Sequence, residues 1–245
     1  MVDKAKNRLI FALDVDDFET ARKWVEQLHD QVGLFKVGKQ LFTRCGPEVV
    51  RMVRSAGAEV FLDLKYHDIP NTVAMAGREA CRLGVKIFNV HALGGREMMA
   101  RTVSEVDAVA PRGSAERPLL LAVTILTSST EETLREVGIN DPVAEMVPRL
   151  AKLAQEAGMD CAVASPREVP LIRAVCGPDF AIVTPGVRPQ SASLDDQKRV
   201  MTPKDAIASG SDYLVIGRPI SAAPDPVAAA QAIVAEMAEG LRVKE

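Results

Sequence analysis

Residues 61–72 read Phe-Leu-Asp-Leu-Lys-Tyr-His-Asp-Ile-Pro-Asn-Thr, an apolar run that ends in three alternating charges. Strand alternation sends Asp63 and Lys65 to one face of a buried strand, and Asp68 follows in the next loop. A lysine between two carboxylates is kept protonated by their field, so Lys65 can hold an anionic centre and donate a proton. The alternative interpretation is a structural ion-pair cluster that caps the strand.

Short apolar or β-branched runs alternate with longer amphipathic segments on both sides of this stretch, a pattern typical of βα units and a parallel sheet. The expected strands are Leu9–Asp14, Leu34–Val37, Glu59–Lys65, Val85–His91, Leu119–Leu126, Cys161–Ala164, Ala181–Thr184 and Tyr213–Ile216. The expected helices are Phe18–Leu28, Gly46–Ser55, Val73–Leu83, Arg96–Ala108, Pro142–Ala157, Ser165–Val175, Pro203–Ala208 and Asp225–Ala238. Capping residues precede several of these helices, among them Asp17, Thr202 and Asp225.

This order of elements predicts the fold class. Eight strands, each followed by a helix, in 245 residues favour an α/β fold of the (β/α)8 TIM barrel type, with residues 1–245 as one domain. A doubly wound open sheet is the alternative.

The composition is that of an ordinary globular protein, with 47% hydrophobic and 26% charged residues. A net charge of -3 provides no electrostatic reason to expect nucleic acid or an anionic membrane as a partner, so small molecules are favoured. The N-terminal sequence MVDKAKNR lacks the order of a secretory signal, and the apolar runs are too short to span a membrane.

Cysteines and histidines predict neither a disulfide framework nor a zinc site. Cys45, Cys81, Cys161 and Cys176 are scattered without a Cys-x-x-Cys pair, and the chain has only three histidines. We therefore expect buried or inert thiols, no metal site and a cytoplasmic location.

Polar residues stand near the carboxyl end of several expected strands, where a TIM barrel has its catalytic mouth. Charged groups at the same end of successive buried strands are costly to desolvate unless they have a function. We interpret His91 as a hydrogen-bonded support and not as a catalyst. The residues concerned are Asp14, Lys36, Asp63, Lys65, Asn89, His91, Thr124 and Thr127.

Two Gly and Arg motifs follow the last two expected strands. Thr184-Pro-Gly-Val-Arg188-Pro comes after the seventh strand, and Ile216-Gly-Arg218-Pro comes after the eighth. Barrels commonly bind a phosphate here through backbone N–H groups, and arginine adds a planar fork of donors. The polar loop from Gln190 to Lys198 is a candidate lid. The alternative is two ordinary surface turns.

A partial P-loop match is rejected. The segment Gly33-Leu-Phe-Lys-Val-Gly38-Lys39 fits the first seven positions of the pattern, but Gln40 stands where Ser or Thr should hold magnesium. Residues 34–37 also have the character of a strand. No Gly-x-Gly-x-x-Gly fingerprint occurs, which disfavours a dinucleotide-binding fold.

Five motifs occur in a fixed order along the chain. They are Ala12-Leu-Asp14, Phe35-Lys36-Val-Gly38, residues 61–72, Thr184-Pro-Gly-Val-Arg188-Pro and Ile216-Gly-Arg218-Pro. Together they resemble the bacterial type of the orotidine 5'-phosphate decarboxylase family, over nearly the whole chain. The Asp-x-Lys-x-x-Asp core is shared with related phosphate-binding barrels, whereas the run through Ile-Pro-Asn-Thr is more specific. Tyr66 and Val187 replace the usual Phe and Ile of that family.

The resemblance implies conversion of orotidine 5'-monophosphate to UMP and CO2, the last step of de novo pyrimidine synthesis, with neither metal nor organic cofactor. It makes Lys65 the proton donor to C6 of the pyrimidine, with Asp63 and Asp68 as the other catalytic residues. The substrate-binding residues that it implies are Asp14, Lys36, Asp63, Lys65, Asp68, Ile69, Thr72, Thr127, Arg188, Gln197, Gly217 and Arg218.

The resemblance also implies which part of the substrate each residue contacts. Lys36 and Asp14 bind ribose hydroxyls, and Thr127 lies beside the pyrimidine. A homodimer with composite active sites is implied, because Asp68 and Thr72 reach into the site of the partner. The phosphate is gripped by Arg188, Gln197, Gly217 and Arg218.

Two other functions are compatible with parts of this pattern. A metal-dependent sugar-phosphate lyase or decarboxylase on the same barrel would share Asp63, Lys65 and Asp68, but it needs an acidic metal ligand near the second strand end, where this chain has Lys36. A non-catalytic nucleotide-binding or regulatory barrel would be expected to have lost the charged trio, which is intact here.

Overall fold

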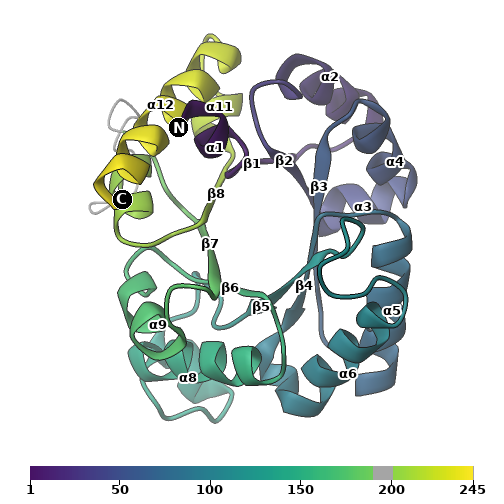
Figure 1. Ribbon diagram of the computed structural model, residues 1–245, viewed down its shortest axis with the longest axis vertical. Coiled ribbons are helices and arrows are strands. Elements are labelled where there is room, and N and C mark those ends of the chain that lie inside the picture. The colour runs from purple at the N-terminus through teal and green to yellow at the C-terminus, as the bar shows by residue number, and fades with distance from the viewer. Residues whose placement is uncertain (190–200, 245) are drawn as a thin grey trace. The chain divides into compact units, whose positions relative to one another are not determined.

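A computed structural model describes residues 1–189 and 201–244 of the chain. Its eight strands form a closed barrel in which each strand neighbours the next in sequence order and β8 pairs in parallel with β1 (Figure 1). The predicted (β/α)8 barrel is confirmed, and the open sheet is excluded. The strands are β1 (Leu9–Ala12), β2 (Leu34–Gly38), β3 (Glu59–Tyr66), β4 (Ile87–His91), β5 (Leu119–Val123), β6 (Cys161–Val163), β7 (Ala181–Pro185) and β8 (Tyr213–Ile216).

Helices alternate with the strands along the chain, as βα units require. Several begin where the sequence predicts a cap. Asp17 accepts a hydrogen bond from Thr20 N at 2.9 Å, and Asp225 accepts one from Ala228 N at 3.0 Å. The helical segments are α1 (Val2–Lys6), α2 (Phe18–Leu28), α3 (Lys39–Cys45), α4 (Glu48–Ser55), α5 (Pro70–Arg82), η1 (Ala92–Gly94), α6 (Gly95–Asp107), α7 (Glu131–Glu136), α8 (Val143–Glu156), α9 (Val169–Cys176), α10 (Pro203–Ala208), α11 (Arg218–Ser221) and α12 (Pro226–Lys244).

The region after β2 differs from the prediction. One helix was expected over Gly46–Ser55, but α3 already begins at Lys39, directly after the strand, and α4 follows it. Gly46 separates the two helices with a φ of 61°, a left-handed conformation that glycine adopts without steric cost. Gly46 therefore ends a helix instead of starting one.

The last helix is longer than predicted. It was expected to end at Ala238, yet α12 continues through Gly240 to Lys244. A side chain at Gly240 would collide with the carbonyl oxygen of Lys204, because α12 packs closely against α10. Glycine in this helix therefore serves close packing and is not a stop signal. The short helices α1, α7 and α11 were not predicted either.

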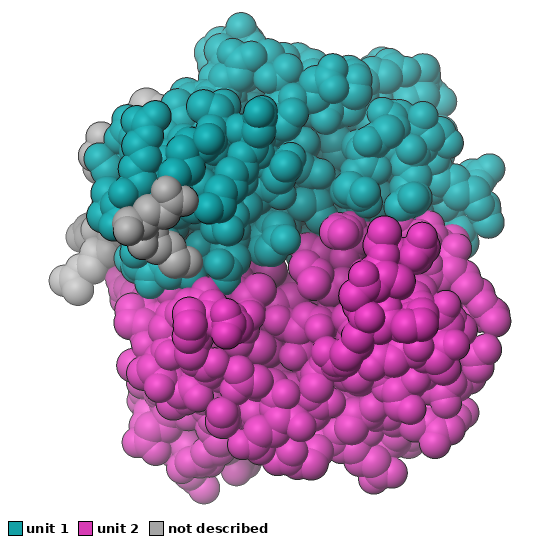
Figure 2. All heavy atoms as spheres, viewed as in Figure 1, with its two compact units in different colours: residues 1–63, 184–245 teal, residues 64–183 magenta. Residues whose placement is uncertain are grey.

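The described residues fall into two compact units, coloured in Figure 2. Unit 1 contains residues 1–63 and 184–245, and unit 2 contains residues 64–183. In unit 1 every residue of β1 is buried, as expected for a strand covered on both faces. In unit 2 the same is true of Ile87–Val90 in β4, while α5 packs against α6 and α8 against α9. Each unit therefore has an apolar core of its own.

None of the described helices is both long and apolar enough to cross a membrane.

Candidate active site

In unit 1, Lys36 lies between two carboxylates. Its ammonium Nζ is 2.8 Å from Asp14 Oδ1 and 3.7 Å from Asp63 Oδ2. The side chains of Lys36 and Asp63 are each 11% exposed, whereas that of Asp14 is 66% exposed. Strand register explains the arrangement, because Lys36 pairs with Ala12 on β1 and Gly38 pairs with Asp63 on β3. The three residues therefore meet near the carboxyl ends of adjacent parallel strands.

Gly38 leaves the room that this cluster needs. A Cβ at this position would lie 3.3 Å from Lys36 Nζ and 3.6 Å from Asp14 Oδ1. The first of these distances is tighter than ordinary van der Waals contact. The glycine that ends β2 thus allows the ammonium of Lys36 to approach the strand ends.

In unit 2, Lys65 has an unusual main-chain conformation. Its φ of 51° makes it the one residue other than glycine with a positive φ in the described ranges. Its N–H donates a hydrogen bond of 2.8 Å to Oδ1 of Asn89 on β4. Asn89 is completely buried, so the acceptor of this hydrogen bond lies in the protein interior. A left-handed lysine at a strand end is a departure of the kind that gathers at functional sites.

This conformation limits the argument from strand alternation. Alternation predicts Asp63 and Lys65 on one face, but it applies to extended backbone, and φ at Lys65 is not extended. Alternation alone therefore does not fix the direction of the Lys65 side chain. The place of Lys65 between two carboxylates stays a prediction, and the structure shows such a place for Lys36.

Asn89 is the residue whose importance the sequence did not reveal. It was recognised only as one of several polar residues near strand ends, without a role. The signal was present, since a completely buried asparagine within an apolar strand requires hydrogen-bond partners. What the sequence lacks is the identity of the partner, which lies 24 residues away along the chain.

The predicted residues that follow β3 and β5 are exposed to solvent. Asp68 Oδ1 accepts a hydrogen bond from the N–H of Ile69 at 2.6 Å, which orients the carboxylate at the start of α5. Ile69 is 67% exposed although it is apolar. Thr72 lies in the first turn of α5, and Thr127 lies beyond the end of β5, both exposed.

The predicted phosphate residues lie in unit 1, with one outside the described ranges. Arg188 is half-buried, and its N–H donates a 3.3 Å hydrogen bond to the carbonyl oxygen of Met201. Gly217 follows β8, and a Cβ there would lie 3.2 Å from Cβ of Ala12, so glycine permits close approach of two strand ends. Arg218 begins α11 and is exposed. Gln197 and the predicted lid at 190–198 lie outside the described residues.

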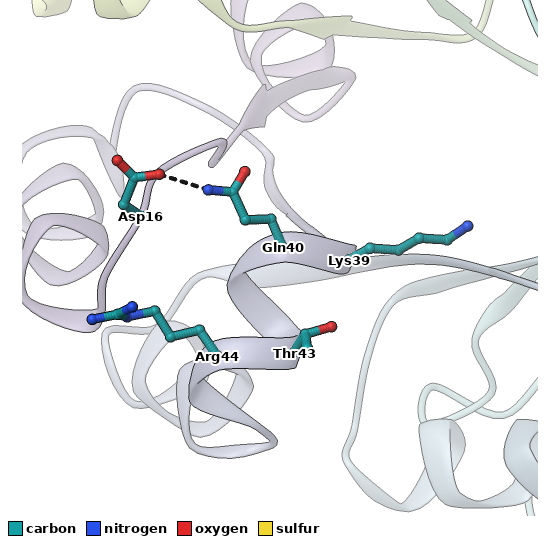
Figure 3. A pocket seen from close by; sticks show the side chains of 5 residues that line it. All are labelled: Asp16, Lys39, Gln40, Thr43 and Arg44. Atoms are coloured by element: carbon teal, nitrogen blue, oxygen red, sulfur yellow. Dashed lines mark hydrogen bonds between the residues drawn. The ribbon is translucent and has the colours of Figure 1, made fainter.

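A surface pocket in unit 1 is lined by none of the residues predicted to bind substrate. Figure 3 shows Asp16, Lys39, Gln40, Thr43 and Arg44 around it. Gln40 Nε2 donates a 2.6 Å hydrogen bond to Asp16 Oδ1, so its amide is engaged by a neighbouring loop. The segment before it is strand β2, which confirms that the partial P-loop match is not a phosphate-binding loop.

The described residues contain no group of three or more His, Cys, Asp or Glu side chains arranged to hold a metal ion. The four cysteines carry no disulfide. Burial raises the pKa values of the Cys81 and Cys176 thiols, which keeps them protonated and unreactive at neutral pH.

Comparisons with known proteins place the chain in a family. Residues 7–233 match the model of the orotidine 5'-phosphate decarboxylase / HUMPS family. The chain belongs to this family. A relative from Syntrophotalea carbinolica, named orotidine 5'-phosphate decarboxylase, is 66% identical over 98% of this chain and 99% of its own length. A relative of the same name from Geobacter sulfurreducens is 66% identical over 97% of this chain and 99% of its own length.

Solved structures agree with this family assignment. Orotidine 5'-phosphate decarboxylase from Lactobacillus acidophilus superimposes with a TM-score of 0.83 at 41% identity, covering 94% of this chain and 98% of that one. The enzyme of the same name from Pyrococcus horikoshii gives a TM-score of 0.75 at 26% identity, covering 94% and 99%. The predicted family is thus confirmed, and the chain is an enzyme of the decarboxylase branch, a lyase.

Proposed function

We propose that the chain converts orotidine 5'-monophosphate to UMP and CO2, with Lys65 as the proton donor to C6. The observation that carries the proposal is the position of Lys36, 2.8 Å from Asp14 and 3.7 Å from Asp63. These carboxylates already have a cation between them, which disfavours a divalent metal at the same place. The metal-dependent lyase would need that place for its metal, so direct decarboxylation is favoured.

The proposed reaction needs only a proton donor and charge stabilisation. The bond between C6 and the carboxylate carbon breaks, CO2 leaves, and the electron pair stays on C6. The Lys65 ammonium stabilises this developing charge and then transfers one proton to C6. The neutral amine regains a proton from water, which completes the cycle. Asp63 would hold Lys65 and contact the ribose side, and Asp68 would lie close to the departing carboxylate.

The other predicted residues would bind the parts of the substrate that do not react. Asp14 and Lys36 would bind ribose hydroxyls, and Thr127 would lie beside the pyrimidine. Remote binding energy of this kind is converted into rate when it is fully realised only in the transition state. The residues proposed to grip the phosphate are Arg188, Gln197, Gly217 and Arg218.

We also propose that the active form is a homodimer in which Asp68, Ile69 and Thr72 reach the partner's site. Exposed apolar side chains support this: Ile69 is 67% exposed, Leu93 44% and Leu126 41%. They follow β3, β4 and β5, and the carboxyl ends of neighbouring parallel strands face the same way. Large apolar side chains at one end of adjacent strands favour a protein interface.

The chain is further proposed to act as one domain over residues 1–245. Both boundaries between the two units fall inside strands, at Asp63 in β3 and at Val183 in β7, and not in linkers. The free thiols support a reducing compartment such as the cytoplasm.

A spectrophotometric assay with orotidine 5'-monophosphate tests the proposed reaction. The ultraviolet absorbance of the substrate should fall on conversion to UMP, and an excess of chelator should not change the rate. Activity that requires added magnesium would favour the metal-dependent lyase. Binding of UMP without any turnover of the substrate would favour the non-catalytic barrel.

The phosphate site is tested with Arg218→Ala. Loss of a charge-assisted contact should cost about 1.5–3 kcal/mol of transition-state binding, which is roughly a 10- to 150-fold lower kcat/KM. An unchanged kcat/KM would refute the role of Arg218. The shortened substrate orotidine, which lacks the phosphate, serves as the control, because its turnover should be insensitive to the substitution.

The composite site is tested by mixing two inactive variants. Lys65→Ala and Asp68→Ala should each be nearly inactive, but a mixed dimer has one site that lacks both residues and one that lacks neither. Random exchange of equal amounts makes half the dimers hybrid, so activity should recover to roughly a quarter of the wild-type site count. No recovery, despite subunit exchange shown by mass spectrometry, would mean that both residues act within one chain.

A further inference from the structure

The main chain at Lys65 is held in a conformation that lysine alone would avoid. At a φ of 51° the Cβ of an L-residue crowds the following carbonyl group, a cost that glycine escapes. Such a conformation persists only where surrounding contacts stabilise it. The question is therefore which contact keeps Lys65 there.

One such contact is a hydrogen bond to the side chain of a buried residue. Oδ1 of Asn89 accepts the Lys65 N–H at 2.8 Å, and Asn89 has no exposed surface. Asn89 is part of β4, where its neighbours Phe88 and Val90 are also fully buried, so its side chain starts from a rigid strand. Releasing the Lys65 N–H into this environment would leave a backbone donor without a partner.

The two residues after Lys65 contact the same strand as Lys65 does, β4. The Tyr66 ring lies edge-on to Phe88 with centroids 6.1 Å apart, and the His67 ring lies 5.5 Å from that of His91. Phe88 and His91 belong to opposite faces of β4, since strand positions alternate. Three consecutive residues, Lys65, Tyr66 and His67, therefore contact β4. Asn89 is the contact of Lys65, whose ammonium is the proposed proton donor.

We infer that Asn89 is a positioning residue that sets the backbone of Lys65 and thereby aims its ammonium. This inference rests on the function proposed above, because it concerns the donor in that reaction. Donation of a proton to C6 requires donor and carbon in near-attack geometry, and a displacement of 1 Å can cost about 100-fold in rate. A residue with a left-handed φ points its Cα–Cβ bond in a different direction from an extended residue. The hydrogen bond to Asn89 therefore sets the direction in which the Lys65 side chain leaves the main chain.

The test replaces Asn89 by leucine, which has a similar shape and no acceptor. In the crystal structure of Asn89→Leu we expect φ of Lys65 to leave the left-handed region. We expect kcat to fall about 100-fold or more, while the dissociation constant of UMP changes by less than about threefold. Asn89→Asp, which keeps the acceptor oxygen, should retain the left-handed φ.

Thr102→Val is the matched control. Thr102 is also buried in unit 2, and its Oγ1 donates a 2.8 Å hydrogen bond to Met98 O within α6. Its replacement likewise removes one buried side-chain bond to the main chain, but one that does not involve Lys65. We expect a comparable loss of thermal stability with kcat within about threefold of wild type. If Asn89 had a role in stability alone, Asn89→Leu and the control would lose similar thermal stability and have similar kcat.

A measurement without substrate separates this inference from the proposed function. Lys65→Gly should raise the melting temperature in the wild-type background, because glycine is unstrained at positive φ, and should raise it less in Asn89→Leu. If Asn89→Leu does not fold, Asn89→Ala serves in the same experiments. The inference would be overturned if φ of Lys65 stayed left-handed without the Asn89 acceptor, or if kcat of Asn89→Leu were no lower than that of Thr102→Val. A wild-type chain that is inactive on orotidine 5'-monophosphate would instead refute the proposed function. The role of Asn89 would then still be tested by φ of Lys65 and by the melting temperatures of the variants.

Discussion

Two lysines near the ends of adjacent strands are positioned by different means. Lys36 on β2 is held through its ammonium, which lies 2.8 Å from Asp14 and 3.7 Å from Asp63. Lys65 on β3 is held through its main chain, by a 2.8 Å hydrogen bond from its N–H to Asn89. The first arrangement acts on the charged end of the side chain, whereas the second acts on the main chain from which the side chain starts.

This difference matches the roles proposed for the two residues. A lysine that binds ribose hydroxyls can be immobilised by carboxylates, since its proton is never transferred. A proton donor must be aimed before the reaction, because orientation achieved in advance costs nothing when charge develops. The backbone hydrogen bond of Lys65 fits this requirement, because it does not depend on the charge of the ammonium.

The largest effect is expected from Lys65→Ala. Loss of both proton donation and charge stabilisation should lower kcat at least about 1,000-fold, while UMP affinity changes much less because the phosphate contacts remain. Turnover can be followed by ultraviolet absorbance and UMP binding by calorimetry. A variant that kept most of its kcat would show that Lys65 is not the donor and would remove the contrast with Lys36.

A smaller effect, chiefly on stability, is expected from Lys36→Met. Asp63 is buried, so removing its nearby cation should cost about 1–3 kcal/mol in the free energy of unfolding, measured with urea. Adding Asp63→Asn should recover part of this loss, because the buried carboxylate that lost this cation is gone. Purely additive losses in the double variant would mean that charge does not hold Lys36.

Asp14→Asn should have a weak effect on stability. Its side chain is 66% exposed, and exposed ion pairs contribute at most about 1 kcal/mol. The difference from wild type should shrink further when the ionic strength is raised from low to 0.5 M, because salt screens the pair. A large loss of stability that does not depend on salt would mean that Asp14, and not Asp63, is the main partner of Lys36.

Gly38→Ala should have the smallest effect. Its new Cβ would lie 3.3 Å from Lys36 Nζ, so the flexible end of the lysine must shift by a few tenths of an ångström. KM for the substrate should rise about two- to threefold, which is roughly 0.4–0.7 kcal/mol, with kcat unchanged. In the Lys36→Met background the effect should vanish, and its persistence there would point to another cause.

Much of the fold was predictable because its signals are local. Eight apolar runs alternate with amphipathic segments, and the strand at Tyr213–Ile216 and the helix at Phe18–Leu28 have the predicted limits. Caps such as Asp17 act within three residues, so their effect can be read from the sequence. The role of Gly240 could not be predicted in this way, because glycine is needed there for close packing against the carbonyl oxygen of Lys204, which is distant in sequence.

The sequence by itself determined the barrel, the family and the residue types that stand near the strand ends. Alternation and chain order are local properties, and parallel strands bring their carboxyl ends to one side. Only the tertiary structure decided how the two lysines are held. The partner of Lys36 depends on strand register, and the conformation of Lys65 depends on a buried side chain 24 residues away. Both are long-range contacts, which no pattern along the chain encodes.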